Sequence, residues 1–340
     1  MDEEVKKEKV VGFFKNHCYL FSFIAGIASI LSLLGTVVTY NTKYYAGETK
    51  VKEYFDVHLW DYFNNSNPMN WTMWITLGLI VIGVVFALLS KRKKNFATLT
   101  SLSFIIAACL LFLSREFFND NASVIANYND ASIGYGASLS IIFLAIGALF
   151  ALIFDYSKNE FTIRDIAEDG ILIALAFGLN FVKIPLGSSG GSANFQMLPL
   201  MIIALRHGPA HGLIAAGLIY GLLTCLTDGY GFATYPFDYL IGFGSVAIMG
   251  FFSKLILVPG QKGYTLKGEL HLLLAGFLST LVRFVGSSAS SMVVYGYSFS
   301  AAIAYNAVYI SVSGALAIAI LMALYGPLCQ INSLFPVSRE

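Results

Sequence analysis

The chain has 340 residues, of which 57% are hydrophobic and 12% are charged, whereas soluble globular proteins carry about 25% charged residues. Its formal net charge is +1, so it has neither the basic excess of a nucleic-acid-binding protein nor an acidic tail. These figures exclude an ordinary soluble enzyme, make nucleic acid an unexpected partner, and predict a polytopic protein of the lipid bilayer.

Ten apolar stretches follow one another along the chain, and a helix that spans a bilayer needs about 20 such residues. They are predicted at 17–40, 72–90, 97–114, 133–154, 168–186, 195–206, 211–227, 237–257, 269–295 and 300–325. The sixth is short and interrupted by Pro199, but we still expect a helix that its neighbours shield, because backbone groups in lipid must be satisfied internally. The predicted fold is all-α, with ten transmembrane helices.

The basic residues predict the orientation, because cytoplasmic loops of membrane proteins carry an excess of Lys and Arg. With the N-terminus inside, most of the 21 Lys and Arg fall on the cytoplasmic side, including the KRKK turn at 91–94. The first apolar stretch is too long for the core of a signal peptide and is expected to remain as a span. We therefore expect a multi-pass protein of the cell membrane with both termini in the cytoplasm.

A change in composition near residue 160 predicts two domains. The polar segment DYSKNEFTIRDIAEDG separates a region 1–160, with four helices and two polar outer loops, from a region 161–340, with six helices joined by very short loops. The sequence assigns no role to the four N-terminal helices.

Motifs for the common enzyme chemistries are absent. The chain has no G-x-x-x-x-G-K-[ST] phosphate loop and no G-x-S-x-G nucleophile motif, and its four cysteines show no C-x-x-C spacing. His207 and His211 have the spacing of a metal-binding pair, but Gly208 and Pro209 break the helix that would align them. We therefore predict a cytoplasmic turn there, with no metal, no cofactor and no enzymatic activity.

Polar side chains at membrane depth are the most informative residues, because they are costly unless they are paired or face a cavity. Asp238, Arg283, Asn306 and Lys183 all fall toward the outer side of the second region. Two interpretations remain open: Asp238 pairs with Arg283 or Lys183 and ties helices together, or these residues line a solute pocket. Tyrosines at the same level favour a pocket, namely Tyr235, Tyr239, Tyr295, Tyr297 and Tyr305. For Tyr297 we favour a place in an interfacial aromatic belt.

The second region also resembles a known family over about residues 165–330. The segments FVKIPLGSSGGSANFQMLPLMIIALRHGPAHGLIAAGLIYGLL, YPFDYLIGFG, RFVGSSASSMVVYG and YNAVY are together similar to the thiamine-specific substrate-binding S components of energy-coupling factor (ECF) vitamin transporters. The resemblance implies a six-helix bundle that binds a vitamin near the outer face, either thiamine or a related cationic or heteroaromatic compound.

The resemblance also implies roles for individual residues. Asp238 looks like the family's acidic residue that offsets the charge of thiamine, Tyr239 like the neighbouring tyrosine, and Asn306 like the asparagine that hydrogen-bonds the ligand. Three further positions differ from the family's residues and are kept as candidate site residues: Ser287 in place of histidine, Ser291 in place of glycine and Tyr295 in place of tryptophan.

The partners implied by the resemblance are the ECF transmembrane subunit and its two ATPases. Ala174 and Gly178 resemble the small-residue motif through which the first helix of the family docks onto that subunit. Two alternatives stay open: an ion- or proton-coupled secondary transporter that works alone, with Asp238 and Arg283 as a switching pair, and a membrane scaffold in which Asp238 only pairs with a basic residue.

Overall fold

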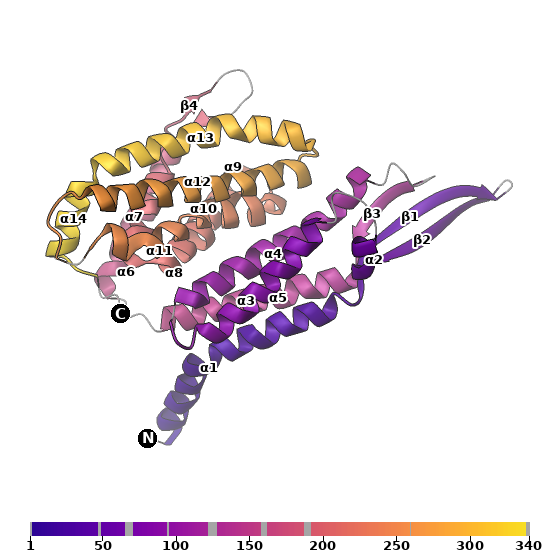
Figure 1. Cartoon of the computed structure of the whole chain (residues 1–340), viewed down its shortest axis with the longest axis horizontal. Helices are drawn as coiled ribbons and strands as arrows, with labels where there is room; N and C mark the ends of the chain where they lie inside the picture. Colours follow the sequence, from indigo (N-terminus) through magenta and orange to yellow (C-terminus); the bar gives the residue numbers. More distant parts are fainter. Residues whose placement is uncertain are drawn as a thin grey trace. The chain divides into compact units, whose positions relative to one another are not determined.

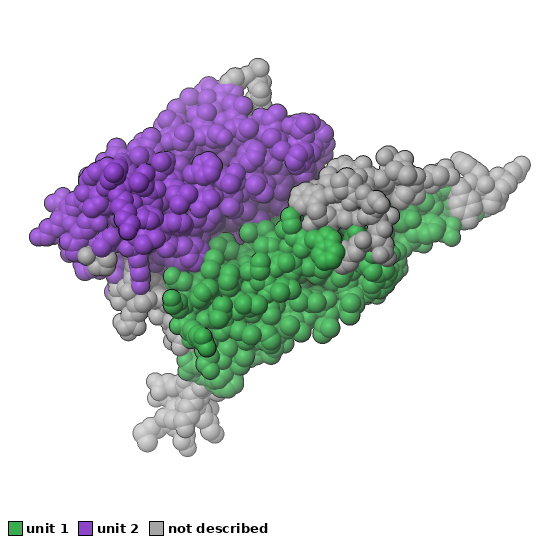
Figure 2. Space-filling model, viewed as in Figure 1, with its two compact units in different colours: residues 1–158 green, residues 159–340 purple. Residues whose placement is uncertain are grey.

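The computed structural model divides the chain into two compact units, residues 1–158 and residues 159–340 (Figure 2). It describes residues 2–46, 49–64, 71–93, 95–121, 128–157, 162–186, 192–258 and 260–337. The described residues include the KRKK turn except for Lys94. Most of the GSSGGS segment at 187–192 lies outside the described residues.

Unit 1 contains four long helices and a small sheet. Its elements in chain order are α1 (Asp2–Ser32), β1 (Thr36–Ala46), β2 (Thr49–His58), α2 (Leu59–Asn64), α3 (Trp71–Leu89), α4 (Asn95–Asn121), β3 (Tyr128–Ile133) and α5 (Tyr135–Ser157). In Figure 1 the long helices α1, α3, α4 and α5 lie against one another, and the strands extend from one end of that bundle. Each of the four apolar stretches predicted for this region overlaps one of these helices. The first prediction, 17–40, is wrong beyond Ser32, because α1 ends there and β1 begins at Thr36.

The strands of unit 1 differ from the outer loops that the sequence predicts. β1 is the central strand and pairs antiparallel with β2 on one side and with β3 on the other. The β1 and β2 segments are rich in Thr, Val and Tyr, residues that favour strands. The sequence predicted loops here because both segments also contain many polar residues. Polar side chains are equally compatible with an exposed antiparallel hairpin.

The core of unit 1 is organised around Phe104 of α4, whose side chain is fully buried. Gly26 of α1, Gly83 of α3 and Gly147 of α5 all face its ring, and a Cβ at any of the three would lie 2.5–2.8 Å from a ring carbon. The missing side chains therefore let three helices close around one aromatic ring.

Unit 2 is a helical bundle with two short strands. Its elements are α6 (Ile163–Asn180), β4 (Ile184–Pro185), β5 (Ser192–Ala193), α7 (Met197–His207), α8 (Pro209–Gly212), the π-helix η3 (Leu213–Tyr220), α9 (Gly221–Asp228), the 3₁₀-helix η4 (Phe232–Thr234), the π-helix η5 (Tyr235–Ile241), α10 (Gly242–Gly244), α11 (Ala247–Ile256), α12 (Leu266–Val293), α13 (Phe299–Ala323) and α14 (Tyr325–Leu334). The runs α8–η3–α9 and η4–η5–α10–α11 are each nearly continuous and correspond to single predicted spans.

Seven helices among the described residues are long and apolar enough to cross a membrane: Thr72–Leu89, Asn95–Arg115, Tyr135–Asp155, Pro209–Asp228, Phe232–Ile256, Leu266–Val293 and Phe299–Ala323. The protein is therefore a mostly helical, multi-pass membrane protein, as predicted. The count of ten stays a prediction, because the apolar helices Asn16–Ser32 and Met197–His207 are shorter and the first two turns of α6 carry four charged residues.

Pro199 does not break the helix in which it lies. α7 begins at Met197, so the proline occupies the first turn, where a backbone N–H has no partner within the helix in any case. α7 is therefore a short but uninterrupted helix from Met197 to His207.

Candidate functional site

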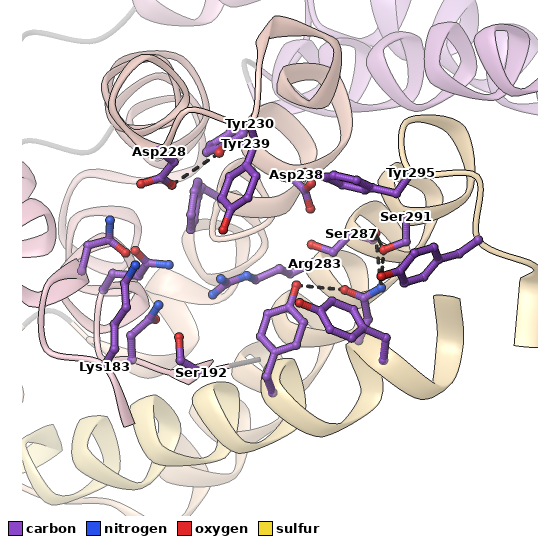
Figure 3. Close-up of a pocket in the computed structure, with 18 residues that line it drawn as sticks. Lys183, Ser192, Asp228, Tyr230, Asp238, Tyr239, Arg283, Ser287, Ser291 and Tyr295 are labelled. Atoms are coloured by element: carbon purple, nitrogen blue, oxygen red, sulfur yellow. Dashed lines mark hydrogen bonds between the residues drawn. The ribbon is translucent and has the colours of Figure 1, made fainter. Parts of the chain in front are cut away.

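A cavity of about 250 Å³ lies within unit 2 (Figure 3). Its lining is rich in tyrosines, amides and charged side chains, and it consists of Asn180, Lys183, Ser192, Asn194, Gln196, Asp228, Tyr230, Asp238, Tyr239, Phe243, Arg283, Ser287, Ser291, Tyr295, Tyr297, Tyr305, Asn306 and Tyr309. Segments far apart in the sequence, from the end of α6 to the middle of α13, therefore meet at one site.

The π-helix η5 places Asp238 and Tyr239 in this lining. Pro236 at the start of η5 has no N–H to donate, and π-helical turns inside helices often occur at functional sites. Close helix packing holds η5 against α12, since a Cβ at Gly286 would lie 2.7 Å from the carbonyl oxygen of Phe237. The absence of a side chain at Gly286 thus brings Asp238 over the polar face of α12.

Asp238 faces the cavity, and no ion pair among the described residues includes it. Its carboxylate has Ser287 and Ser290 of α12 beside it and lies within the electrostatic influence of Arg283. The structure thus does not show the helix-tying ion pair that was one of the two interpretations of this residue. A carboxylate with hydroxyl groups on one side and a cavity on the other can accept a hydrogen bond from a ligand or balance its positive charge.

Arg283 is the second charged group at the centre of the site. Its side chain is 7% exposed, its guanidinium carbon lies 4.9 Å from the centroid of the Phe243 ring, and Nε has no hydrogen-bond partner among the described residues. In Figure 3 it extends between the labelled side chains around the cavity. With Lys183 it balances the formal charges of Asp228 and Asp238, so the cavity holds both signs of charge.

Asn306 connects α13 to α12 through a network of hydrogen bonds. Its side-chain Nδ2 donates to Ser291 Oγ at 2.8 Å and to the carbonyl oxygen of Ala302 at 2.8 Å, and its Oδ1 accepts from the Tyr309 hydroxyl at 2.9 Å. Because these bonds use both amide hydrogens, Asn306 fixes the positions of Ser291 and Tyr309 and presents few free donors to a ligand.

Tyrosine rings form a continuous wall at the mouth of the cavity. Successive ring centroids are 6.5 Å apart for Tyr230 and Tyr295, 6.4 Å for Tyr295 and Tyr297, 6.0 Å for Tyr297 and Tyr305, and 5.5 Å for Tyr305 and Tyr309. Tyr297 is therefore part of the cavity lining rather than only of an aromatic belt. Burial and the nearby negative charge of Asp238 raise the pKa of Tyr295 to about 12, so its ring stays neutral at physiological pH and can stack on a flat cation.

All six residues that the sequence nominated for ligand binding lie in the lining: Asp238, Tyr239, Ser287, Ser291, Tyr295 and Asn306. Sequence reasoning missed Asp228, which accepts a hydrogen bond from the Tyr239 hydroxyl at 3.4 Å. It also missed Gln196, which accepts one from Tyr220 at 2.6 Å. Asp228 precedes a glycine with φ of 77°, so the Asp-Gly pair was a turn signal at the end of an apolar span, and that signal could have identified it.

The two residues predicted to dock a partner lie on α6. Ala174 and Gly178 are both exposed, and a Cβ at Gly178 or at Gly170, a further four residues before Ala174, would meet no atom within 4 Å. Their face of α6 is therefore a flat stripe of small residues that another helix can approach closely.

The chain is similar to known proteins in three comparisons. Residues 166–332 match the family model described as thiamine transporter protein (Thia_YuaJ). An uncharacterised protein from Pyrococcus woesei is 30% identical over 134 residues, which cover 39% of this chain and 81% of that protein. A solved structure of ThiT from Listeria monocytogenes has 22% sequence identity and a TM-score of 0.43, and the match covers 49% of this chain and 97% of that one.

Proposed function

Since the chain belongs, through residues 166–332, to the thiamine transporter family, and is thus a transporter rather than an enzyme, we propose that unit 2 binds thiamine for uptake across the cell membrane. A related cationic or heteroaromatic vitamin precursor is the broader substrate class. The observation that carries the proposal is the Asp238 carboxylate, which faces a tyrosine-walled cavity and takes part in no ion pair among the described residues.

The chemistry of the cavity suits a small aromatic cation. An opposite charge interacts more strongly with a carboxylate in a partly dehydrated cavity than in water, and the rings of Tyr239 and Tyr295 offer faces for cation–π contact. The volume of about 250 Å³ is near the lower limit for small-molecule sites, so it suits one vitamin-sized ligand. Arg283 and Lys183 are positioned to interact with polar groups at the other end of such a ligand.

The energy for uptake comes, in this proposal, from an ATP-driven ECF module. The chain has no phosphate loop of its own, and the exposed small-residue stripe of α6 offers a surface for the ECF transmembrane subunit. In this arrangement unit 2 acts as the high-affinity S component, and both termini of the chain lie in the cytoplasm.

The test is a titration of the purified full-length protein in detergent with thiamine and with a neutral analogue in which carbon replaces the charged ring nitrogen. We expect Asp238→Asn to weaken thiamine binding by about 1–3 kcal/mol, roughly 5- to 150-fold, as for a charge-assisted hydrogen bond. Affinity for the neutral analogue should change much less, because the substitution removes charge but keeps size.

The matched control is Asp56→Asn on β2, whose carboxylate accepts a hydrogen bond from Thr39 in unit 1 and should not affect binding. Equal losses for the charged and neutral ligands on Asp238→Asn would contradict the electrostatic role. Gradient-driven thiamine uptake by vesicles that contain only this chain would instead support the self-contained secondary transporter.

A further inference from the structure

A second cluster of polar side chains lies on α6, far from the cavity. Asp169 is eleven residues before the cavity residue Asn180 on the same helix, a distance of about 16 Å along the axis. Its Oδ1 lies 2.5 Å from Nδ1 of His207, and its Oδ2 lies 2.6 Å from Nδ1 of His211. One ligand atom from each of the three residues falls within 4.8 Å of the others.

The helix break at Gly208 and Pro209 is what brings the two histidines together. Gly208 has φ of 94° and ends α7, and Pro209 starts α8. The break between α7 and α8 leaves both imidazole rings on the side that faces α6, with their ring centroids 5.4 Å apart. The predicted helix break is therefore confirmed, but it does not separate the two histidines, because both contact Asp169.

The cluster contains three acidic side chains around its two histidines. Asp165, Glu168 and Asp169 are opposed by one arginine, Arg206, which forms a two-bond ion pair with Glu168. The side chain of Arg206 is 3% exposed and that of Asp169 is 13% exposed. Carboxylates and imidazoles are both ligands of divalent transition-metal ions, so the cluster offers suitable donor groups for such an ion.

The arrangement around His207 favours a metal ligand. Its Nε2 lies 3.6 Å from Glu168 Oε2 and 3.9 Å from Asp165 Oδ1, and a carboxylate facing the distal ring nitrogen is how metal-binding histidines are oriented. The other ring nitrogen, Nδ1, faces the carboxylate of Asp169.

We propose that Asp169, His207 and His211 form a binding site for a divalent transition-metal ion of the zinc class. Two imidazole nitrogens and one carboxylate oxygen are donors that zinc accepts, at distances of about 2.0–2.2 Å. Ligand atoms around such an ion lie about 3.3 Å apart, so small outward movements of the two imidazoles admit it. The ion joins α6 to the α7–α8 turn, and this site does not depend on what the cavity binds.

The experiment uses the full-length protein purified in detergent with an affinity tag other than polyhistidine, after removal of metal with a chelator. Zinc is titrated in competition with a coloured chelator, and cobalt is added separately to record its visible absorption. We expect one zinc ion per chain with a Kd in the micromolar range or tighter, together with cobalt bands typical of nitrogen and oxygen ligands. Asp169→Asn and His211→Gln should each weaken zinc binding by at least tenfold.

The matched control is His271→Gln on α12, because that partly exposed histidine bonds the backbone of Lys267, is not one of the three proposed ligands, and should leave zinc binding unchanged. Thermal unfolding of each variant shows that it is folded, whether or not it binds thiamine. If a variant does not fold, zinc binding by the wild-type protein decides the proposal. Absence of stoichiometric zinc binding in the wild type, or equal binding by all variants, would overturn the site and leave a proton-bridged charge network in its place.

Discussion

Asp238 illustrates how a single residue can be both costly and useful in a membrane protein. A charged side chain at membrane depth is unfavourable unless it is paired or hydrated. This carboxylate faces a cavity beside two serine hydroxyls and forms no ion pair with the part of the chain that the structure describes. Binding of a cation reduces the cost of keeping it there. In the proposed function, the same carboxylate is therefore unfavourable in the empty site and favours the binding of a cation.

The ring of Tyr295, rather than its hydroxyl, should determine its contribution to affinity. The side chain is 46% exposed at the mouth of the cavity, where a face can stack on a flat cation. We expect Tyr295→Ala to weaken thiamine binding about tenfold, Tyr295→Phe to change it little, and Tyr295→Trp to strengthen it, because tryptophan is the best cation–π partner. Titration of the three variants checks this order. A loss on Tyr295→Phe as large as that on Tyr295→Ala would assign the role to the hydroxyl.

The amide of Asn306 should contribute more to stability than to direct ligand contact. It bonds Ser291 and Tyr309 across α12 and α13, and such bonds between membrane helices contribute about 0.6 kcal/mol on average and up to about 1.7 kcal/mol. We expect Asn306→Leu to destabilise the protein by an amount in this range for each bond lost, measured by thermal unfolding in detergent. Tyr309→Phe removes only one of the bonds of Asn306 and should cost less; equal costs would contradict the network.

At the scale of elements, Phe104 is expected to hold three helices of unit 1 together. Replacing a buried phenylalanine with alanine leaves a cavity and costs about 3–5 kcal/mol. Phe104→Ala should therefore lower the thermal stability of the protein strongly. Phe112→Ala on the same helix is the control, because that side chain is 46% exposed. Similar losses for both variants would show that the glycine-lined site around Phe104 is not tightly packed.

The small-residue stripe of α6 should be needed for partner docking and not for vitamin binding. Ala174→Leu combined with Gly178→Leu adds bulk to an exposed face without touching the cavity. We expect the double variant to bind thiamine with unchanged affinity and to lose co-purification with the ECF transmembrane subunit. Ala304→Leu, at an exposed position of α13, should retain both. Retained co-purification of the double variant would place the docking surface elsewhere.

Sequence patterns predicted the long helices well because length and hydropathy suffice to define a span. They failed where geometry depends on tertiary contacts. The strands β1 and β2 are polar enough to resemble loops, and Pro199 looked like a break although it occupies a first turn. The contacts of His207 and His211 with Asp169 join residues about 40 positions apart, which no local pattern encodes. Asp238 was found because a lone acid in an apolar stretch is conspicuous, whereas Asp228 at a turn was not.

At the scale of the whole molecule, the cavity and the Asp169 cluster are expected to face opposite sides of the membrane. α12 has 28 residues and is therefore about 42 Å long, enough to cross a bilayer. Its C-terminal end leads to Tyr295 and Tyr297 at the mouth of the cavity, and its N-terminal end follows the loop that contains Lys262. The charge distribution predicts that this loop is cytoplasmic, which places the mouth of the cavity outside.

Labelling of single cysteines tests this topology directly, because all four native cysteines are buried and should react slowly. Ser300→Cys at the start of α13 and Lys262→Cys between α11 and α12 both introduce thiols at exposed positions. In intact cells, a membrane-impermeant maleimide should label Ser300→Cys and not Lys262→Cys, whereas permeabilised cells should show labelling of both. The reverse pattern in intact cells would invert the protein and place the tyrosine-lined cavity on the cytoplasmic side, where it could not capture a vitamin from outside.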